Sequence, residues 1–446
     1  MRFHIITYGC QMNEADSRLM AGLLEQAGWR QAESLHDADL VVVNTCSVRD
    51  KPERKVWGLL GQLRLLKERR PSAVVVVAGC MAQRVGEELA AKAAHVDAVL
   101  GTRSFHRIVE AAALARAGER PIVLTDLADD PARDRCQVAA VGAAPLCAYV
   151  PIILGCTNFC SYCIVPHVRG PEASRPADRI MEEVRVLAAR GAREVTLLGQ
   201  NVLAYGRDLG EATGFAELLA MLANIEGLWR LRFLTCHPRD VTPALARCMA
   251  EQANVCEHIH LPVQAGSDRL LREMNRGYTA AHYRATVAML REHVPGLAIT
   301  TDIMVGFPGE TDKEFEESLR FYEEIGFDGA FTFAFSARPG TAAAVRADQV
   351  PGEVKIARLQ RLIALQNRIT VARNQAEVGR RVEVLVEGRA ERGEGLLSGR
   401  TRHHKQVVFP GPAELIGSLV EVRLTTAHLW GFTAEAVAAP AGAHAR

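Results

Sequence analysis

The feature that most constrains the fold is the alternation of short apolar runs with helical patterns along most of the chain. In residues 1–125 the apolar runs are rich in β-branched residues, as in strands that are buried on both faces of a parallel sheet. Strand–helix–strand alternation predicts an α/β domain with a doubly wound parallel sheet. The predicted strands lie at residues 3–10, 38–46 and 73–80, and the helices between them at 17–27 and 53–69.

Each of these three strands ends in a cysteine: Cys10, Cys46 and Cys80. For each cysteine considered alone, the alternative is a buried structural thiol, because the cysteine side chain packs as a small hydrophobic group. The carboxyl ends of parallel strands, however, lie at one edge of the sheet, where ligands bind. The same placement in three strands therefore predicts a three-cysteine site, with thiolates suited to an iron–sulfur cluster.

Six further strand-like runs alternate with helical patterns in residues 146–375. Six repeats predict an incomplete (β/α)6 barrel, related to the eightfold barrel whose chemistry lies at the carboxyl ends of its strands. Cys156, Cys160 and Cys163 follow the first run with the spacing C-x3-C-x2-C, so we expect them on the active face. The runs lie near residues 148–154, 194–199, 231–235, 257–263, 298–305 and 329–335.

Three thiolates on so short a loop can hold three irons of a [4Fe-4S] cluster and leave the fourth iron open. An open iron can bind a group other than protein, which points to chemistry rather than to a structural role. The alternative is a zinc site. Zinc normally takes four ligands, usually in two C-x2-C pairs, and the sequence has no second C-x2-C pair.

Polar residues follow other strands of the predicted barrel on the same face. Gln200 and Asn201 come after the second run, and Gln264 comes after the fourth. Their amide groups can hydrogen-bond the amino, carboxylate and ribose groups of a cofactor. The alternative for each is an ordinary turn or helix-cap residue.

The pattern changes in residues 376–438, where short strands punctuated by Gly and Pro predict a small, OB-like β-barrel. Two basic segments predict an RNA-binding surface through phosphate contacts. The alternatives are a solvated hairpin and a solvated helix face. The candidate residues are Arg400, Arg402 and Lys405 in the predicted barrel, and Lys355, Arg358 and Arg361 on a preceding helix that has no acidic residue over 354–376. A linker is expected at 126–145 and a disordered tail at 439–446.

The overall composition narrows the class of protein. The 446 residues suggest two to four domains. With 53 basic and 52 acidic residues the net charge is +1, so any nucleic-acid surface must be local. The chain has eleven cysteines, no signal-peptide layout and no apolar run of membrane-spanning length. We therefore expect a cytoplasmic protein without membrane association, in which cysteines bind metals.

With these residues assembled, the chain resembles the radical SAM methylthiotransferases over nearly its whole length. Cys156, Cys160 and Cys163 look like the radical SAM motif, and Cys10, Cys46 and Cys80 match the N-terminal domain of that family. The last segment is similar to its RNA-binding TRAM domain. The implied domains are a methylthiotransferase N-terminal domain at 1–125, a radical SAM core at 146–375 and a TRAM domain at 376–438.

Within this family the chain is most similar to the MiaB type, which acts on isopentenylated adenosine beside the anticodon of tRNA. Three features depart from the pattern: Ala265, Pro171 and the Trp430-Gly431-Phe432 stretch. The alternatives are a methylthiotransferase for threonylcarbamoyl-adenosine in tRNA or for a ribosomal protein, and, from another class, a non-catalytic iron–sulfur RNA-binding protein. The residues that carry the resemblance are 9–13 with Asp16 and Ser17, 197–202, 260–264 and 338–341.

The resemblance implies two [4Fe-4S] clusters and S-adenosylmethionine, which serves as both methyl donor and radical source. The implied reaction is methylthiolation of C2 of N6-isopentenyladenosine at position 37 of tRNA. Cys156, Cys160 and Cys163 would hold the cluster that binds S-adenosylmethionine, and Tyr162 would pack on its adenine. Cys10, Cys46 and Cys80 would hold the auxiliary cluster. The implied partners are the anticodon arm of tRNA and an electron donor such as flavodoxin or ferredoxin. The sulfur donor stays open, and a monomer is expected.

Overall fold

The structure is a computed structural model that describes residues 1–47, 50–128, 144–210 and 213–437. It divides into two compact units. The first comprises Met1–Gly191, Thr196–Glu226 and Ser336–Ala344, and the second comprises Ala192–Val195, Gly227–Phe335 and Val345–Arg446. The predicted linker is described only at 126–128 and 144–145, and the predicted tail lies outside the described residues.

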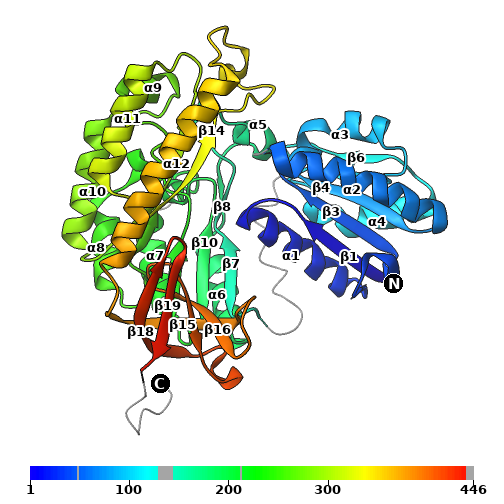
Figure 1. The fold of residues 1–446 in the computed structure, drawn as a ribbon. Helices are drawn as coiled ribbons and strands as arrows, with labels where there is room; N and C mark the ends of the chain where they lie inside the picture. Colours follow the sequence, from blue (N-terminus) through cyan, green and yellow to red (C-terminus); the bar gives the residue numbers. More distant parts are fainter. Residues whose placement is uncertain (48–49, 129–143, 211–212, 438–446) are drawn as a thin grey trace. The chain divides into compact units, whose positions relative to one another are not determined.

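The first unit contains a six-stranded parallel sheet with the order β2-β1-β3-β4-β5-β6 (Figure 1). Its strands are β1 (Arg2–Thr7), β2 (Arg30–Gln31), β3 (Leu40–Thr45), β4 (Val74–Gly79), β5 (Ala98–Leu100) and β6 (Ile122–Leu124). The connecting helices are α1 (Gln11–Gln26), α2 (Asp50–Arg69), α3 (Cys80–Lys92) and α4 (Ile108–Ala117). The prediction of a doubly wound sheet is confirmed.

Both faces of this sheet are covered, which explains its uninterrupted apolar strands. Along β3, Leu40 and Val42 join the core formed with α1 and α4, while Val41 and Val43 join the core formed with α2 and α3. Successive side chains of a strand point to opposite faces. A strand buried on both sides therefore has no position for a polar side chain until it reaches its end.

The first unit continues into the start of the predicted barrel. Ile152 donates its backbone N–H to the carbonyl oxygen of Leu198 at 2.8 Å, which links the β7 segment to the end of β10. The short strands β8 and β9 pair antiparallel and lie on either side of the second cysteine motif in the sequence. The elements are β7 (Cys147–Pro151), β8 (Ile153–Leu154), α5 (Val165–Arg169), β9 (Ala173–Ser174), α6 (Ala177–Ala189), β10 (Glu194–Leu198) and α7 (Phe215–Ala223). The first two residues of β10, Glu194 and Val195, are assigned to the second unit.

The second unit contains a parallel sheet with the order β12-β13-β14, flanked by helices. Its elements are β11 (Arg230–Phe233), α8 (Pro243–Glu251), β12 (His258–His260), α9 (Asp268–Glu273), α10 (Ala280–His293), β13 (Ala298–Val305), α11 (Asp312–Ile325), β14 (Gly329–Ala334) and α12 (Gly352–Gln375). All six strands predicted for the incomplete barrel are therefore present, as β7 and β10 to β14.

The second unit also contains a closed five-stranded barrel with the order β15-β16-β17-β19-β18, as predicted for the last segment. It is closed by the parallel pair β17–β19, in which Gln406 lies opposite Gly431. A Cβ on Gly431, whose φ is +148°, would lie 1.9 Å from the Gln406 carbonyl oxygen, so only glycine fits there. The strands are β15 (Arg381–Arg389), β16 (Leu396–Thr401), β17 (Gln406–Pro410), β18 (Leu419–His428) and β19 (Gly431–Ala436).

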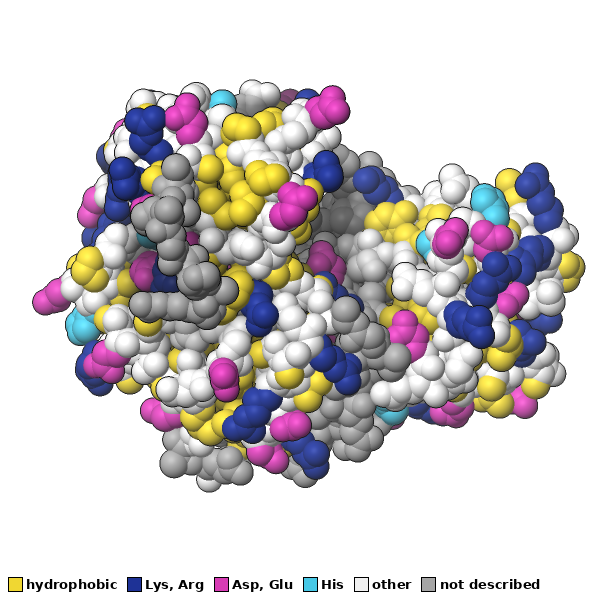
Figure 2. Space-filling model, turned by 90° about the horizontal axis from the view of Figure 1, so that it is seen from below, with side chains coloured by type: hydrophobic (Ala, Val, Ile, Leu, Met, Phe, Trp, Pro, Cys, Tyr) yellow, Lys and Arg dark blue, Asp and Glu magenta, His cyan; other side chains and the backbone are white. Residues whose placement is uncertain are grey.

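The surface matches the nearly balanced charge of the sequence. Figure 2 shows basic and acidic side chains interspersed over the face in view. A nucleic-acid surface must therefore be made by individual cations rather than by a global field. Within the described part of the chain, none of the helices is long and apolar enough to cross a membrane.

Candidate iron–sulfur site

The first cysteine triad lies at one edge of the six-stranded sheet, as predicted. Cys10 follows β1 and caps α1, Cys46 follows β3, and Cys80 opens α3 directly after β4. These three strands are neighbours in the sheet, so their carboxyl ends lie side by side. Cys46 and Cys80 are buried, and Cys10 is exposed. None of the ten cysteines in the described residues forms a disulfide.

The three thiols of this triad influence each other electrostatically. Burial raises the pKa of Cys80 to about 11. The positive charge of Arg169 opposes this increase, while Cys46, Cys10 and Asp16 add to it.

A network of amide side chains fixes the strand ends that carry this triad. Asn13 donates through Nδ2 to Oδ1 of Asn44 at 3.1 Å and to the carbonyl oxygen of Thr45 at 3.0 Å. Asn44 in turn donates to the carbonyl oxygen of Asn13 at 2.8 Å and to Oγ of Ser17 at 2.9 Å. Residues near Cys10 that carried the family resemblance therefore hold α1 against the end of β3.

The chain passes very close to itself beside Cys80. Gly79 has φ of +100°, and a Cβ there would lie 2.4 Å from the Thr45 carbonyl oxygen. A larger residue would push the ends of β3 and β4 apart. Glycine before this cysteine is therefore required by the approach of the two strands.

The second triad lies on the loop after β8. Gly155 donates its N–H to Oε1 of Gln200 at 2.5 Å, and Cys156 donates its N–H to the carbonyl oxygen of Gly170 at 3.1 Å. A tight turn joins Cys163 N–H to the Cys160 carbonyl oxygen at 2.9 Å. All three cysteines are half-buried. Burial raises the pKa of Cys156 to about 11, and the backbone and side chain of Asn158 oppose that increase.

The two triads approach each other within the first unit. Cys80 packs in one apolar cluster with Ile164, the residue that follows Cys163, and with Val168. Helix α5, which carries Val168, contacts helix α3, which begins at Cys80. Both triads therefore border the same region of the molecule.

Three side chains brace this contact. Thr102 donates through Oγ1 to the carbonyl oxygen of Val168 at 2.5 Å. Arg103 donates to the carbonyl oxygens of Arg169 at 3.1 Å and Pro171 at 2.7 Å. Arg169 donates through Nη2 to Oδ2 of Asp16 at 2.8 Å, and both side chains of that pair are buried. These contacts hold α5 against the edge of the six-stranded sheet.

The cysteines fit iron–sulfur clusters better than a zinc ion. A single zinc ion holds each thiolate at about 2.3 Å and therefore draws its ligands tightly together. In a cluster each thiolate binds a separate iron, so the ligands stand further apart. Three cysteines without an acidic or histidine co-ligand are the donor set that such clusters use.

The four residues predicted to contact the cofactor differ in their surroundings. Tyr162 is half-buried on the second cysteine loop, and Asn201 is buried at the end of β10. Gln200 already accepts a hydrogen bond from Gly155, which gives it a role in shaping the loop. Gln264 has φ of +70° and links β12 to β13 through its backbone. Their contact with a cofactor stays a prediction.

The cations predicted to bind RNA in the closed barrel have partners within the second unit. Arg402 donates to both carboxylate oxygens of Glu257 at 2.7 Å. Lys405 is buried and donates to Glu377 at 2.7 Å and Asn374 at 2.9 Å. Arg400 is the most exposed of the three cations and lies 3.7 Å from Glu387. Arg402 and Lys405 therefore stabilise the protein itself, and RNA contact by any of the three stays a prediction.

The basic face of α12 is also paired with acidic residues. Arg358 is buried and binds Glu310 at 2.8 Å and Asp312 at 2.7 Å. Arg361 binds Glu316 at 2.6 Å, and Lys355 lies over the ring of Phe335. The acidic partners come from α11 and the loop before it. RNA contact by these three cations also stays a prediction.

Sequence reasoning missed a buried charge cluster in the second unit. Arg230 and Arg232 of β11 are buried and flank Glu194 at 3.9 and 3.0 Å. Their guanidinium groups donate to the carbonyl oxygens of Arg400, at 2.6 Å, and Arg402, at 2.7 Å. The available signal was the alternation of arginine with apolar residues over 229–233, which places both arginines on one face of a strand.

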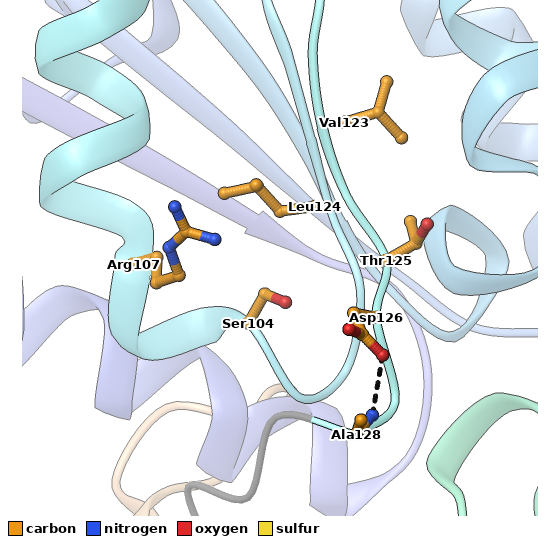
Figure 3. A pocket seen from close by; sticks show the side chains of 7 residues that line it. All are labelled: Ser104, Arg107, Val123, Leu124, Thr125, Asp126 and Ala128. Carbon is orange, nitrogen blue, oxygen red and sulfur yellow. Dashed lines mark hydrogen bonds between the residues drawn. The ribbon is translucent and has the colours of Figure 1, made fainter.

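A pocket in the first unit is lined by residues that follow β5 and by residues of β6 and the segment after it (Figure 3). Asp126 accepts a hydrogen bond from the Ala128 N–H at 2.8 Å and closes a turn at its rim. The described lining contains none of the six motif cysteines, so we assign it no part in the chemistry. Its lining residues are Ser104, Arg107, Val123, Leu124, Thr125, Asp126 and Ala128.

Comparison with known families divides the chain into three matched regions. Residues 2–101 match the uncharacterized protein family UPF0004, residues 150–322 match the Radical SAM superfamily, and residues 375–437 match the TRAM domain. The first cysteine triad lies in the first matched region and the second triad in the second. The closed barrel lies in the third.

Similar proteins cover almost the whole chain. A tRNA-2-methylthio-N(6)-dimethylallyladenosine synthase of Moorella thermoacetica is 48% identical over 438 residues, which is 98% of each chain. The protein of that name from Pelotomaculum thermopropionicum is 46% identical over 96% of each chain. Among solved structures, the radical S-adenosylmethionine methyltransferase TsrM from Kitasatospora setae, with cobalamin and a [4Fe-4S] cluster bound, aligns with a TM-score of 0.55. At 14% identity over 89% of this chain and 80% of that one, it shows likeness of fold alone.

Proposed function

Because this chain belongs to the tRNA-2-methylthio-N(6)-dimethylallyladenosine synthase family, we propose that it attaches a methylthio group to C2 of N6-isopentenyladenosine at position 37 of tRNA. The observation that carries this proposal is the apolar cluster in which Cys80 of the first triad packs with Val168 and with Ile164, the residue that follows Cys163 of the second triad. One triad suffices for a radical enzyme. An enzyme that also inserts sulfur needs a second cluster, and the other cysteine triad would hold it.

The target carbon explains why the chain relies on cofactors. The C–H bond at adenine C2 has no useful acidity, so a positioned acid or base cannot activate it. When bound, two [4Fe-4S] clusters and S-adenosylmethionine supply the radical, the sulfur and the methyl group that side chains lack. The task of the protein is to hold the clusters, S-adenosylmethionine and the target adenine in positions from which they can react.

The residues of the first unit fit that task. Cys156, Cys160 and Cys163 would hold the cluster that binds S-adenosylmethionine, on a loop that the Gln200 side chain and the Gly170 carbonyl orient. Cys10, Cys46 and Cys80 would hold the auxiliary cluster, at strand ends that the amide network fixes. The apolar cluster of Cys80, Ile164 and Val168 would exclude water from one side of the first triad, which would protect reactive species there from side reactions.

The substrate base must reach this region from a folded RNA. An adenine beside the anticodon has to leave the stack of the loop before its C2 edge is accessible. The TRAM domain would bind the anticodon arm. We further propose that the protein acts as a monomer in the cytoplasm, with an electron donor such as flavodoxin or ferredoxin.

Mass spectrometry of tRNA nucleosides tests the function. Cells that lack the gene should lose 2-methylthio-N6-isopentenyladenosine and accumulate N6-isopentenyladenosine. The native gene should restore the product, and a matched gene carrying Cys156→Ala should not. Loss of the methylthio group from threonylcarbamoyl-adenosine or from a ribosomal protein instead would establish one of the alternative methylthiotransferases. An unchanged nucleoside profile together with intact RNA binding would favour a non-catalytic iron–sulfur protein.

The exposed cation of the closed barrel provides a test of tRNA contact. Arg400→Glu should weaken tRNA binding and reduce the salt slope of log Kd by about 1, as expected for the loss of one phosphate contact. Lys405→Ala is the matched comparison, because its buried ammonium is held by Glu377 and Asn374. It should lower thermal stability more than Arg400→Glu does. Filter binding over a salt series measures the first effect, and an unchanged slope would remove Arg400 from the interface.

A further inference from the structure

Trp430 lies exposed at the tip of the hairpin that joins β18 to β19 in the closed barrel. Its surface is 76% exposed, more than that of any other tryptophan or phenylalanine in the described residues. The stretch that contains it departs from the pattern of the family that the chain resembles. Phe432, two residues later, is buried in the core of the barrel. The packing of the barrel therefore uses Phe432 and does not account for the ring of Trp430.

The backbone that carries Trp430 is fixed on both sides of the ring. Gly431 lies opposite Gln406 in the pair β17–β19, where the close approach of the two strands admits only glycine. Before the ring, the carbonyl oxygen of His428 accepts a hydrogen bond from Nδ2 of Asn374 at 2.8 Å. An exposed ring on a fixed backbone loses little conformational freedom when a partner covers it.

The strands of this hairpin present polar groups around the ring. Oγ1 of Thr433 and Nε2 of His428 are 2.8 Å apart, and Arg423 forms an exposed ion pair with Glu435 at 2.9 Å. Among the described residues of the closed barrel, the only other exposed large apolar side chain is Ile416. It lies before the start of β18, whereas Trp430 follows its end. A protein interface is built around a cluster of apolar side chains, and this surface lacks one.

The cations of the closed barrel leave little charge for a nucleic acid. Arg402 and Lys405 are each held by a carboxylate of the second unit. Of the three predicted cations Arg400 is the most exposed, with 39% of its side chain accessible. A chain with a net charge of +1 cannot rely on a strong general attraction to phosphates. Stacking of a base on an aromatic ring supplies affinity without charge, because every base has a π-face.

We propose that Trp430 is a stacking platform for an unpaired base of the substrate tRNA. This inference rests on the proposed function, which makes tRNA the partner, and adds to it a contact that carries no charge. Proteins that bind RNA through aromatic side chains stack them on bases that have left a helix, since paired bases already stack on each other. Trp430 should therefore distinguish RNA with an unpaired loop from a continuous duplex.

Two measurements on the full chain test this inference: tryptophan fluorescence and filter binding, both with a tRNA that carries N6-isopentenyladenosine at position 37. Trp430→Ala should raise Kd on the order of tenfold, as for the loss of one stacked base, and should leave the salt slope of log Kd unchanged. Trp430→Phe should keep most of the affinity, because phenylalanine retains a ring. It should lose the fluorescence quenching that tRNA causes in the native protein. A duplex with the sequence of the anticodon stem but no loop should quench neither protein.

Trp57→Ala is the matched control, because Trp57 is also exposed, at 36%, but lies on α2 in the first unit. It should leave the tRNA affinity and the quenching at their native values. Both variants at Trp430 should melt close to the native temperature, since the ring lies outside the core of the barrel. Weaker binding that is accompanied by a large loss of thermal stability in both would show a structural role instead and overturn the inference.

The outcomes also separate this inference from the proposed function. If the native protein binds no tRNA, the proposed function is wrong and the inference falls with it. If the native protein binds tRNA and Trp430→Ala binds it with the same Kd, the inference alone is overturned. Quenching by the loop-free duplex would also overturn it, because no unpaired base would be needed. A change in the sedimentation of Trp430→Ala with unchanged tRNA affinity would show that a second copy of the chain covers the ring.

Discussion

Cys80→Ser protein is expected to cleave S-adenosylmethionine reductively at a rate close to that of the native protein, yet to form almost no methylthio product on tRNA. The second triad lies on a separate loop after β8, and its own hydrogen bonds to Gln200 and Gly170 do not involve Cys80. Serine keeps the size of the side chain but removes the soft sulfur that iron–sulfur chemistry needs. Product formation should fall by more than about 100-fold, the upper range for changes one shell further from a metal.

Two assays on one preparation check this expectation: release of 5′-deoxyadenosine and formation of the methylthio nucleoside. Cys248→Ser is the matched control, because Cys248 is also buried but lies on α8 in the second unit, outside both triads. It should retain both activities. Loss of S-adenosylmethionine cleavage in Cys80→Ser would show that the two triads do not act separately, and normal methylthiolation would show that Cys80 is not a ligand.

Glu194→Leu is expected to lower the free energy of unfolding by about 3–5 kcal/mol, the usual cost of leaving a buried charge without its partner. Glu194 is 3% exposed and stands beside two buried arginines, Arg230 and Arg232. These arginines donate to the backbone of the hairpin between β16 and β17. Without the carboxylate, Arg232 would lose its ion pair in the interior, while Arg230 would keep its ion pair with Glu383 at 3.0 Å. The melting transition that includes the closed barrel should therefore shift most.

Denaturant unfolding followed by fluorescence and circular dichroism measures this effect. Glu435→Leu is the control, because its ion pair with Arg423 belongs to the same unit but is exposed, with side-chain exposures of 61% and 57%. Exposed pairs contribute about 0–1 kcal/mol, so that change should be small. Equal stability of the two variants would mean that water or another group solvates the arginines when Glu194 is lost.

The fold was predictable for those elements whose own residue pattern identifies them. Strands such as β3 are apolar at every position because helices cover both faces, and this pattern is visible in a single sequence. Because parallel strands align their carboxyl ends, the place of Cys10, Cys46 and Cys80 at one edge also followed from the sequence. The approach of Cys80 to Ile164 did not, since it depends on how a later segment packs against that edge.

The basic face of α12 shows what such reasoning leaves open. The helix has no acidic residue of its own over 354–376, and this suggested a phosphate-binding surface. In the structure two of its arginines pair with acids of α11: Arg358 with Asp312, and Arg361 with Glu316. Periodicity along one helix cannot report the charges on its neighbour. A helix of one sign is therefore as consistent with an oppositely charged neighbour as with a nucleic acid.

Ion pairs between residues far apart in the sequence also escape prediction, both in the closed barrel and at the sheet edge that carries the first cysteine triad. Arg402 reaches Glu257 across 145 residues, and Arg169 reaches Asp16 across 153 residues. Neither pair has a local signature, because both depend on how separately folded segments pack. Motif spacing identified the cysteines, whereas these pairs needed the three-dimensional structure.

The apolar contact between Cys80, Ile164 and Val168 decides whether a fragment of the protein can keep the surroundings of the first cysteine triad intact. The regions matched to known families end at residue 101 and resume at residue 150, which suggests two interchangeable modules. The wall of the first triad is nevertheless completed by side chains from the second region. An excised N-terminal fragment would carry all three thiols with one side open to water and to oxidants. As a unit of inheritance, the proposed cluster site is therefore larger than the domain that would supply its ligands.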